Sequence, residues 1–403
     1  MKYDFTSIMD RKGKDAIAVD MIGKMPNFAP NLPKEGFDVI PMWVADMNFP
    51  IAPSIQEAMI ERIKHPAFGY FGIRDEYYEA IIKWQKDNFG TTIAKENIGY
   101  ENGVLGGVIT ALRVLISSGD NVLINSPTYI GFTMALGNNG YNIVHSPLVK
   151  DKEGIWRMNL EDMENKIVQN KIHATVFCNP HNPTGRVWEK EEIEAAMEMF
   201  KKHDVFVISD EIWSDLVLTG HKHIPTSSIS EDAKMRTISM YAPSKTFNLA
   251  GLIGSYHIIF NRYLRERIDK ESSLSHYNDC NVLSMYALIG AYDPEGYEWY
   301  RELLEVINTN VDYALNFIKQ NFKGVELSKP GGTYMLYLDI SEYCKDNKIS
   351  CADVIKRGTD CGVAWQDGRM FVWPDTIRMN LALPTSLVKE AFNRLDKYVF
   401  NLK

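Results

Sequence analysis

The segment ATVFCNPHNPTGRVWEKEEIEAAMEMFKKHDVFVISDEIW (174–213) decides the fold of this chain. It begins with a short apolar run, ATVFC (174–178), and a second one, VFVIS (205–209), lies near its end. The amphipathic stretch between them, EKEEIEAAMEMFKKH (189–203), opens with acidic residues and closes with basic ones, as a helix dipole favours. Short apolar runs without alternation are typical of strands that are buried on both faces. The segment therefore predicts a strand–helix–strand unit of a parallel sheet.

The same pattern continues on both sides of this segment. Further buried strands are predicted at 121–125, 236–240 and 256–259. Together they give a strand–helix series that runs from about residue 95 to about residue 285. We expect this series to form a large α/β domain over residues 46–288.

The two ends of the chain have a different character. The tail is expected to contain a strand at 337–340, a helix near 351–361, a strand at 377–383 and a helix near 386–400. The head contains four prolines in its first 41 residues and is typical of an extended arm. Residues 1–45 and 289–403 are therefore predicted to form a smaller domain.

The composition excludes several classes of protein. The 403-residue chain is 45% hydrophobic and 11% aromatic, which excludes wholesale disorder, and its net charge of −8 disfavours broad attraction to nucleic acid. The start, MKYDFTSIMDRKGK (1–14), places charges where a signal peptide needs an apolar core. The longest uncharged stretch, between Asp120 and Lys150, contains turn residues. We expect a cytoplasmic protein with neither nucleic-acid nor membrane partners.

Cysteine and histidine residues have simple interpretations. The five cysteines are odd in number and have no CxxC spacing, so free thiols in a reducing cytoplasm are expected, with a catalytic cysteine as the alternative. His221 and His223 have the spacing of metal ligands on a strand, but the sequence offers no third ligand. No metal site is predicted.

Polar or aromatic residues follow four of the predicted strands. They are Tyr129 after 121–125, Asn182 after 174–178, Asp210 after 205–209 and Lys245 after 236–240. Ligands of open α/β sheets bind beyond the carboxyl ends of the strands. A pyridine cofactor with an aldehyde group needs an acid for its ring nitrogen, a donor for its phenolic oxygen, a ring to stack on and an amine. The four residues supply these groups.

Each of these residues also has an ordinary interpretation when it is taken alone. Tyr129 is then a packed loop tyrosine, and the segment 179–185 is a turn. Asp210 is then a helix N-cap, and Lys245 is a surface lysine. Their occurrence together on strand ends favours the cofactor site.

Longer motifs make the interpretation more specific. The motifs NPHNPTG (179–185), SDEIW (209–213) and SKTFNLAGL (244–252) resemble those of the fold-type I pyridoxal-phosphate enzymes of the aminotransferase class I/II superfamily. Three others are similar to motifs of the MalY/PatB-type cystathionine β-lyases, or C–S lyases: WVADMNFPIAP (43–53), HPAFGYFG (65–72) and PGGTYMLYLD (330–339). The resemblance implies an α/β fold in which helices sandwich a mainly parallel, seven-stranded-type sheet. A smaller α+β C-terminal domain completes it.

The resemblance also implies a role for each candidate residue toward pyridoxal 5′-phosphate and the substrate. Lys245 holds the cofactor covalently, Asp210 pairs with its ring nitrogen, Asn182 and Trp213 reach its phenolic oxygen, and Tyr129 stacks on its ring. The cofactor phosphate meets Val104, Leu105 and Ser244, and Tyr70 reaches it from the neighbouring subunit of a homodimer. Arg378 binds the α-carboxylate of an amino-acid substrate, and Asn182 and Ala45 complete the substrate site.

The chain departs from the superfamily pattern at a few positions. Trp213 stands where many members have tyrosine, Ile253 where many have a phosphate-binding arginine, and Ala242 where many have serine. The loss of the arginine is shared with the C–S lyases and favours that branch. The loop at 371–378 is shorter than the version usual in the superfamily.

The resemblance implies a carbon–sulfur β-lyase. L-Cystathionine or a cysteine-type thioether would be cleaved by α,β-elimination to a thiol, pyruvate and ammonia, as a cysteine-S-conjugate β-lyase does. An aminotransferase is the alternative, because the two reactions share their first steps and the same residues serve both. A regulatory protein that retains the cofactor site is a third hypothesis.

Overall fold

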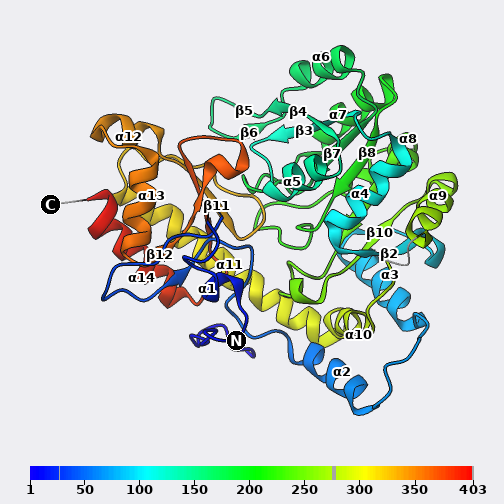
Figure 1. The fold of residues 1–403 in the computed structure, drawn as a ribbon, viewed down its shortest axis with the longest axis horizontal. Coiled ribbons are helices and arrows are strands. Elements are labelled where there is room, and N and C mark those ends of the chain that lie inside the picture. The colour runs from blue at the N-terminus through cyan, green and yellow to red at the C-terminus, as the bar shows by residue number, and fades with distance from the viewer. Residues whose placement is uncertain (27, 275–277, 402–403) are drawn as a thin grey trace.

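A seven-stranded sheet forms the centre of the computed structural model, which describes residues 1–26, 28–274 and 278–401 (Figure 1). In spatial order its strands are β2 (Ile98–Asn102), β10 (Gly254–Ile258), β9 (Thr237–Tyr241), β8 (Phe206–Asp210), β7 (Ala174–Cys178), β3 (Asn121–Ser126) and β4 (Asn142–Pro147). Neighbouring strands are parallel except where β10 pairs with β2 and with β9. The expectation of a mainly parallel, seven-stranded sheet is confirmed, with β10 as the reversed strand.

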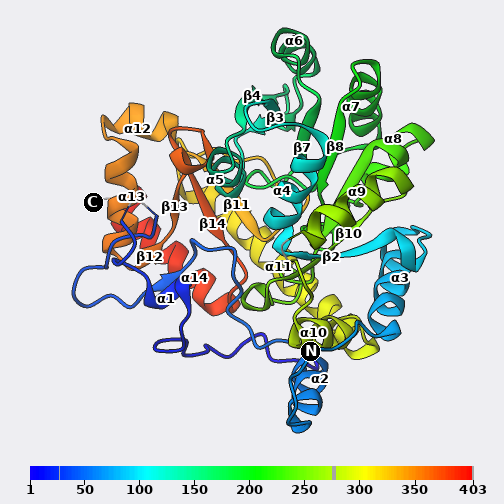
Figure 2. The ribbon, with the colours of Figure 1, turned by 45° about the vertical axis from the view of Figure 1, so that its right-hand side comes forward.

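Helices cover both faces of this sheet, because successive residues of a strand point to opposite sides (Figure 2). In β3, Val122 and Ile124 belong to an apolar cluster with residues of three helices, whereas Leu123 belongs to a second cluster with residues of three others. The first set is α4 (Gly103–Leu115), α5 (Ile130–Asn138) and α9 (Arg262–Ser273). The second set is α6 (Leu160–Asn170), α7 (Lys190–Lys202) and α8 (Glu231–Arg236).

Three further helices share an apolar cluster with residues of β2, β9 and β10: α2 (Pro53–Lys64), α3 (Asp75–Phe89) and α10 (Val282–Ala291). The helix α10 packs against both α2 and α3. Short elements join the larger ones: η1 (Lys95–Asn97), η2 (Thr226–Ser228), η3 (Ala250–Leu252), and the paired strands β5 (Val149–Lys150) and β6 (Trp156–Arg157). No helix among the described residues is both long enough and apolar enough to cross a bilayer.

The tail of the chain builds a second, smaller sheet. Its antiparallel strands lie in the order β11 (Met335–Asp339), β14 (Thr376–Asn380) and β13 (Gln366–Asp367). The helices of this part are α11 (Pro294–Asn321), α12 (Ser341–Asn347), α13 (Cys351–Asp360) and α14 (Thr385–Leu395), with short turns η4 (Gly368–Phe371) and η5 (Asp396–Phe400). The predicted strands and helices of the tail correspond to β11, α13, β14 and α14.

The head of the chain runs along this smaller sheet. It contains a short helix, α1 (Ile17–Asp20), and a strand, β1 (Ile40–Pro41), which pairs in parallel with β12 (Val363–Ala364) of the tail. The Trp43 indole donates to the carbonyl of Ala18 at 3.0 Å. This hydrogen bond holds the segment around α1 against the segment that follows β1. The division of the chain at residues 46–288 stays a prediction.

Candidate active site

The carboxyl ends of the central strands surround a cavity of about 200 Å³. Nine residues predicted from the sequence line this cavity: Ala45, Val104, Leu105, Tyr129, Asn182, Asp210, Trp213, Ser244 and Lys245. They come from the N-terminus of α4 and from the ends of β3, β7, β8 and β9, with Ala45 from the arm. The fold therefore brings together groups that lie up to 200 residues apart in the chain.

Asp210 is the last residue of β8 and is buried. A turn follows it, so it does not cap a helix. Its Oδ1 accepts the backbone N–H of Ile212 at 3.1 Å. Burial raises the pKa of Asp210 from 3.8 to about 7; this N–H and the charge of Lys245 oppose the rise, and Glu211 adds to it. A cation placed against this carboxyl would keep it ionised, so Asp210 fits a protonated ring nitrogen.

Lys245 lies in the loop after β9, and its side chain lines the cavity. Its Nζ donates to the carbonyl of Ala45 at 3.1 Å and lies 5.8 Å from the ring centroid of Trp213. Desolvation lowers the pKa of the Lys245 amine to about 8, and the charge of Arg378 adds to this effect. The lowered pKa leaves more of the amine unprotonated near neutral pH than in an ordinary lysine, and the unprotonated form is the nucleophile toward an aldehyde.

The first turn of α4 forms another wall of the cavity, through Gly103, Val104 and Leu105. The first N–H groups of a helix have no partner within the helix, and the helix dipole is positive there. Ser244 lies on the same cavity and adds a hydroxyl. Ile253 lines this wall where an arginine stands in many superfamily members, so helix N–H groups and a hydroxyl are the phosphate donors available here.

Two aromatic residues border the cavity with fixed orientations. The Tyr129 ring packs edge-on against Phe132, with ring centroids 5.5 Å apart. A Cβ on Gly131 would lie 2.3 Å from Tyr129 Cε1, so glycine is required there for this ring position. The Trp213 ring is buried and packs edge-on against Tyr334 at 4.8 Å. Tyr129 thus offers a ring face for stacking, and Trp213 offers an indole N–H.

Arg378 lies in β14 and is buried; it does not line the cavity but contacts Asn182, which does. Its Nη1 donates to Asn182 Oδ1 at 3.1 Å, and its Nη2 donates to the carbonyl of Trp43 at 3.0 Å and to Gln366 Oε1 at 2.6 Å. Its Nε is buried without a hydrogen-bond partner among the described residues. Desolvation lowers its pKa to about 10, so the guanidinium stays charged at neutral pH. A buried cation with a spare N–H fits a carboxylate.

Residues around Arg378 were missed by the sequence reasoning. Gln366 and Phe371 carry no local signal, although the Arg378 guanidinium lies 4.5 Å from the centroid of the Phe371 ring. Trp43 lies in the motif at 43–53, but its backbone carbonyl has no sequence signature. These residues become recognisable only when β13, β14 and the arm are placed side by side.

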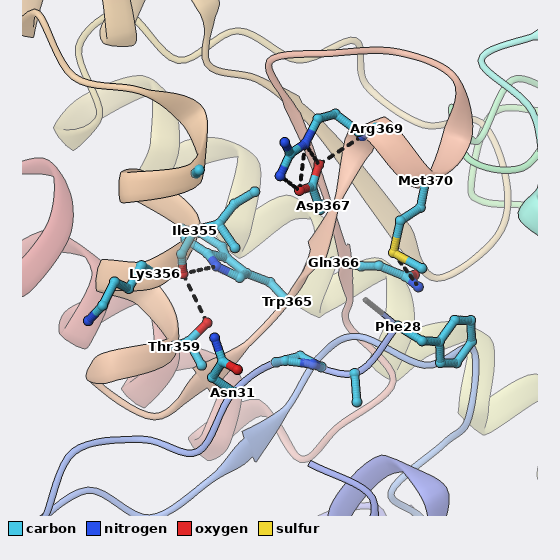
Figure 3. Close-up of a pocket in the computed structure, with 13 residues that line it drawn as sticks. Phe28, Asn31, Ile355, Lys356, Thr359, Trp365, Gln366, Asp367, Arg369 and Met370 are labelled. Atoms are coloured by element: carbon cyan, nitrogen blue, oxygen red, sulfur yellow. Dashed lines mark hydrogen bonds and ion pairs between the residues drawn. The ribbon is translucent and has the colours of Figure 1, made fainter. Parts of the chain in front are cut away.

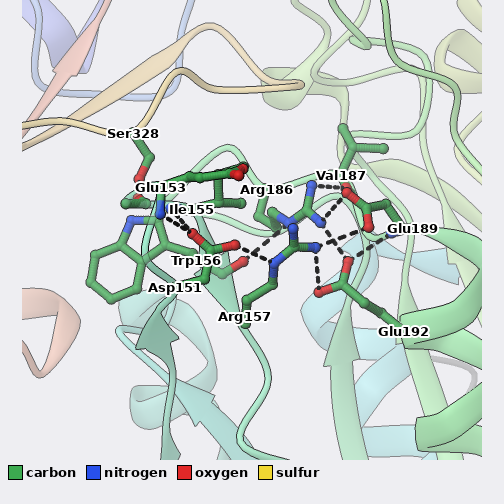
Figure 4. A network of polar contacts seen from close by, with 11 residues as sticks. Asp151, Glu153, Ile155, Trp156, Arg157, Arg186, Val187, Glu189, Glu192 and Ser328 are labelled. Atoms are coloured by element: carbon green, nitrogen blue, oxygen red, sulfur yellow. Dashed lines mark hydrogen bonds and ion pairs between the residues drawn. The ribbon is translucent and has the colours of Figure 1, made fainter.

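An arginine network anchors the loop that carries Asn182 (Figure 4). The buried Arg186 guanidinium donates to the carbonyls of Trp156 and Val187 and pairs with Glu189 and Glu192. Directly before Arg186, a Cβ on Gly185 would lie 2.5 Å from Pro330 Cβ, and Gly185 has φ of +70°, so only glycine fits. These contacts fix the C-terminal end of the loop, shortly after Asn182.

Other candidate groups lie outside the cavity. Tyr70 is fully exposed and lines a separate pocket with Phe68, Phe71 and Cys280. His223 Nε2 lies 2.7 Å from Glu211 Oε2 behind β8, and no cluster of three metal-ligating side chains occurs among the described residues. All five cysteines are free, and desolvation raises the pKa of each thiol. A catalytic thiolate is therefore disfavoured.

The charged and aromatic groups of the cavity fit pyridoxal 5′-phosphate. The carboxyl of Asp210 suits the ring nitrogen, the amine of Lys245 suits the aldehyde, and the N-terminus of α4 suits the phosphate.

Comparisons with known proteins agree with this geometry. The model of the aminotransferase class I and II family matches residues 38–395. The cystathionine β-lyase PatB of Bacillus subtilis (strain 168) is 36% identical over 321 residues, which are 80% of this chain and 82% of PatB. The PLP-bound C–S lyase of Staphylococcus hominis has a TM-score of 0.87 and 32% identity, over 98% of both chains. Cystalysin from Treponema denticola, whose crystal structure contains pyridoxal 5′-phosphate, has a TM-score of 0.90 and 30% identity, over 100% of both chains.

Proposed function

The chain belongs to the aminotransferase class I and II family and to the group of C–S lyases that includes PatB, and we propose that it is a PLP-dependent carbon–sulfur β-lyase. Its substrates are L-cystathionine or cysteine-type thioethers, and its products are a thiol, pyruvate and ammonia. The observation that carries the proposal is the meeting of the Lys245 amine and the Asp210 carboxyl in one cavity beside Arg378. The similarity to the PLP-bound C–S lyase of Staphylococcus hominis and to cystalysin, which contains the same cofactor, supports it.

The cofactor is pyridoxal 5′-phosphate, which would supply an electron sink for the negative charge left at the substrate Cα when its proton is removed. Loss of the thiolate from Cβ would then complete the elimination. Lys245 anchors it, and Asp210 keeps a proton on its ring nitrogen. Tyr129 and Asn182 hold the ring in place, while Val104, Leu105 and Ser244 bind the phosphate.

The substrate end of the site is built around Arg378. Its guanidinium binds the α-carboxylate, and Asn182, which already accepts from Arg378 Nη1, steadies this pair. The Lys245 amine, with its lowered pKa, removes the proton from Cα near neutral pH. Ala45, whose carbonyl accepts from Lys245 Nζ, positions that amine and borders the substrate.

Each site is proposed to contain residues of two subunits of a homodimer. The loop between α2 and α3 exposes three aromatic side chains, Phe68, Tyr70 and Phe71. Ile60 and Ile63, in the last turns of α2 just before this loop, are exposed as well. Aromatic residues with little charge are typical of an interface core. We propose that a second copy of the chain covers this loop and that Tyr70 reaches the phosphate of the partner's site.

The test of the function is a pair of assays on the purified protein. With L-cystathionine or a cysteine S-conjugate, release of thiol and pyruvate is expected together with the visible absorbance of bound cofactor. Lys245→Ala is expected to abolish both. The control is Lys222→Ala, which removes an exposed lysine and is expected to change neither. Amino transfer to a 2-oxo acid without pyruvate release would identify an aminotransferase instead. A protein that stays colourless with added PLP would overturn the proposal.

A further inference from the structure

The guanidinium of Arg378 is held by acceptors that are all uncharged. They are Asn182 Oδ1, the backbone carbonyl of Trp43 and Gln366 Oε1, and the contact with Gln366, at 2.6 Å, is the shortest. No carboxylate of the described residues forms an ion pair with Arg378. Buried arginines usually have an acid partner, because an isolated buried charge is costly. The charge of Arg378 is therefore left for a ligand.

Gln366 holds this arrangement from the neighbouring strand. It lies in β13 directly opposite Arg378 in β14, and both side chains are 3% exposed. Because its Oε1 accepts from the guanidinium, its Nε2 must face the other way. The partner there is the thioether of Met370, with Nε2 and Sδ 3.7 Å apart, at the wall of a cavity of about 650 Å³ (Figure 3). Both ends of the amide are thus committed, and the acceptor end is fixed on Arg378.

A glutamate at this position would have almost the same shape and would accept from Arg378 equally well. Its negative charge, however, would complete a buried ion pair. The hydrogen bond to Arg378 does not by itself require glutamine, since glutamine and glutamate can both accept it. What distinguishes glutamine is that it orients the guanidinium without neutralising it.

We infer that Gln366 is a positioning residue that sets substrate specificity: its neutral oxygen aims Arg378 while it preserves the charge that selects substrates with a free α-carboxylate. The inference rests on the proposed role of Arg378 in binding that carboxylate. Gln366 itself touches Arg378 and not the reacting atoms. Its effect should therefore appear in substrate binding rather than in the chemical step.

The test uses the holoenzyme and two substrates, S-ethyl-L-cysteine and its methyl ester, which lacks the negative charge. With Gln366→Glu, the contact between the substrate carboxylate and a now neutralised Arg378 is weakened, so KM for the free acid is expected to rise on the order of 10- to 100-fold, the range for loss of a hydrogen bond between charged groups, with a smaller change in kcat. KM for the ester and the midpoint of thermal unfolding should stay near the wild-type values. Propionate, a bare carboxylate, should inhibit the variant correspondingly less.

Two further variants isolate the charge. Gln366→Met removes the oxygen that aims the guanidinium but leaves its charge unopposed, so KM for the acid should rise about three- to tenfold, less than in Gln366→Glu, while KM for the ester stays near the wild-type value. Gln169→Glu adds the same charge at an exposed position of α6 and should leave all values unchanged. Should Gln366→Glu fail to fold, the methionine variant still decides, because an unchanged KM for the acid there would overturn the inference.

The outcomes separate this inference from the proposed function. A wild-type enzyme without preference for the acid over the ester would refute the carboxylate-binding role of Arg378. A preference that is present in the wild type and survives Gln366→Glu would leave that role intact and refute the inference alone. An equal loss of kcat for both substrates with a lower unfolding midpoint would show that Gln366 is merely structural.

Discussion

Replacing Asp210 by asparagine should make the cofactor-free protein more stable and the holoenzyme nearly inactive. Asparagine keeps an oxygen that can accept the Ile212 N–H, which Asp210 Oδ1 accepts at 3.1 Å. It removes a carboxyl group that is buried at the end of β8. The two opposite effects arise because the same charge is unfavourable in the cofactor-free protein and required for catalysis.

The magnitude follows from the pKa of Asp210. Burial raises this pKa from 3.8 to about 7, a shift of about three pH units, and each unit corresponds to ~1.36 kcal/mol. Between these two pKa values the folded state binds the proton that the unfolded state has released, so stability falls as pH rises. Above about pH 7 the penalty is complete at ~4 kcal/mol. This is an upper bound for the gain, because the Lys245 amine loses a favourable neighbour.

The assay is denaturant unfolding of cofactor-free wild type and Asp210→Asn at several pH values. The advantage of the variant should grow by ~2–3 kcal/mol between pH 5 and pH 8 and level off above the folded pKa. Asp346→Asn, which removes the same charge from an exposed position of α12, is the matched control and should show no such trend. Equal effects of Asp210→Asn at both pH values would refute the reasoning.

The holoenzyme should respond in the opposite direction. A charge that is preorganised against a developing charge in the transition state contributes ~3–4 kcal/mol, so turnover of Asp210→Asn should fall by a factor on the order of 10² to 10³. The folded state and the bound cofactor should be retained. Near-normal turnover would show that Asp210 does not face the ring nitrogen.

Three further predictions concern the other site residues. The rate at which added PLP combines with Lys245 in the cofactor-free protein should rise with pH through a midpoint near 8, because the unprotonated amine reacts; a stopped-flow midpoint above 10 would contradict the lowered pKa. Arg378→Lys should raise KM for the free amino acid about tenfold or more, since a lysine ammonium cannot keep the contacts of the guanidinium to Asn182 and Gln366 and also bind the carboxylate, and steady-state kinetics that show only a lower kcat would argue against it. Mixing Tyr70→Ala with Lys245→Ala chains under subunit exchange should restore up to about half the wild-type activity per hybrid dimer, as a shared site requires. Proven exchange without recovery would place both residues in the same subunit's site.

The sequence by itself determined the central strands and the residues at their ends. Each of these signals is local: Asp210 directly follows the apolar run that predicts β8, and Lys245 lies four residues after the end of β9. The hydrophobic pattern that buries a strand also places its last residue at the edge of the sheet. For this reason Asp210, Lys245, Asn182 and Tyr129 were all found, and all line one cavity.

Several elements carried weaker signals and were missed. The strands β2 and β4 are the two edges of the sheet, and both are only partly buried, so neither has a continuous apolar run. The strand β10 was expected within a parallel series but runs antiparallel. Its connection from β9 contains the Lys245 loop and only the short turn η3, without a crossover helix of the kind that parallel neighbours need.

Only the tertiary structure decided the environment of Arg378. Its hydrogen-bond partners Gln366, Asn182 and Trp43 lie 12, 196 and 335 residues away in the chain. Neither helical nor strand periodicity encodes contacts over such separations, because they arise when the arm, the loop after β7 and β13 pack around β14. The sequence could name the arginine, but its burial among neutral acceptors, and hence the charge that it keeps for a ligand, follows from packing alone.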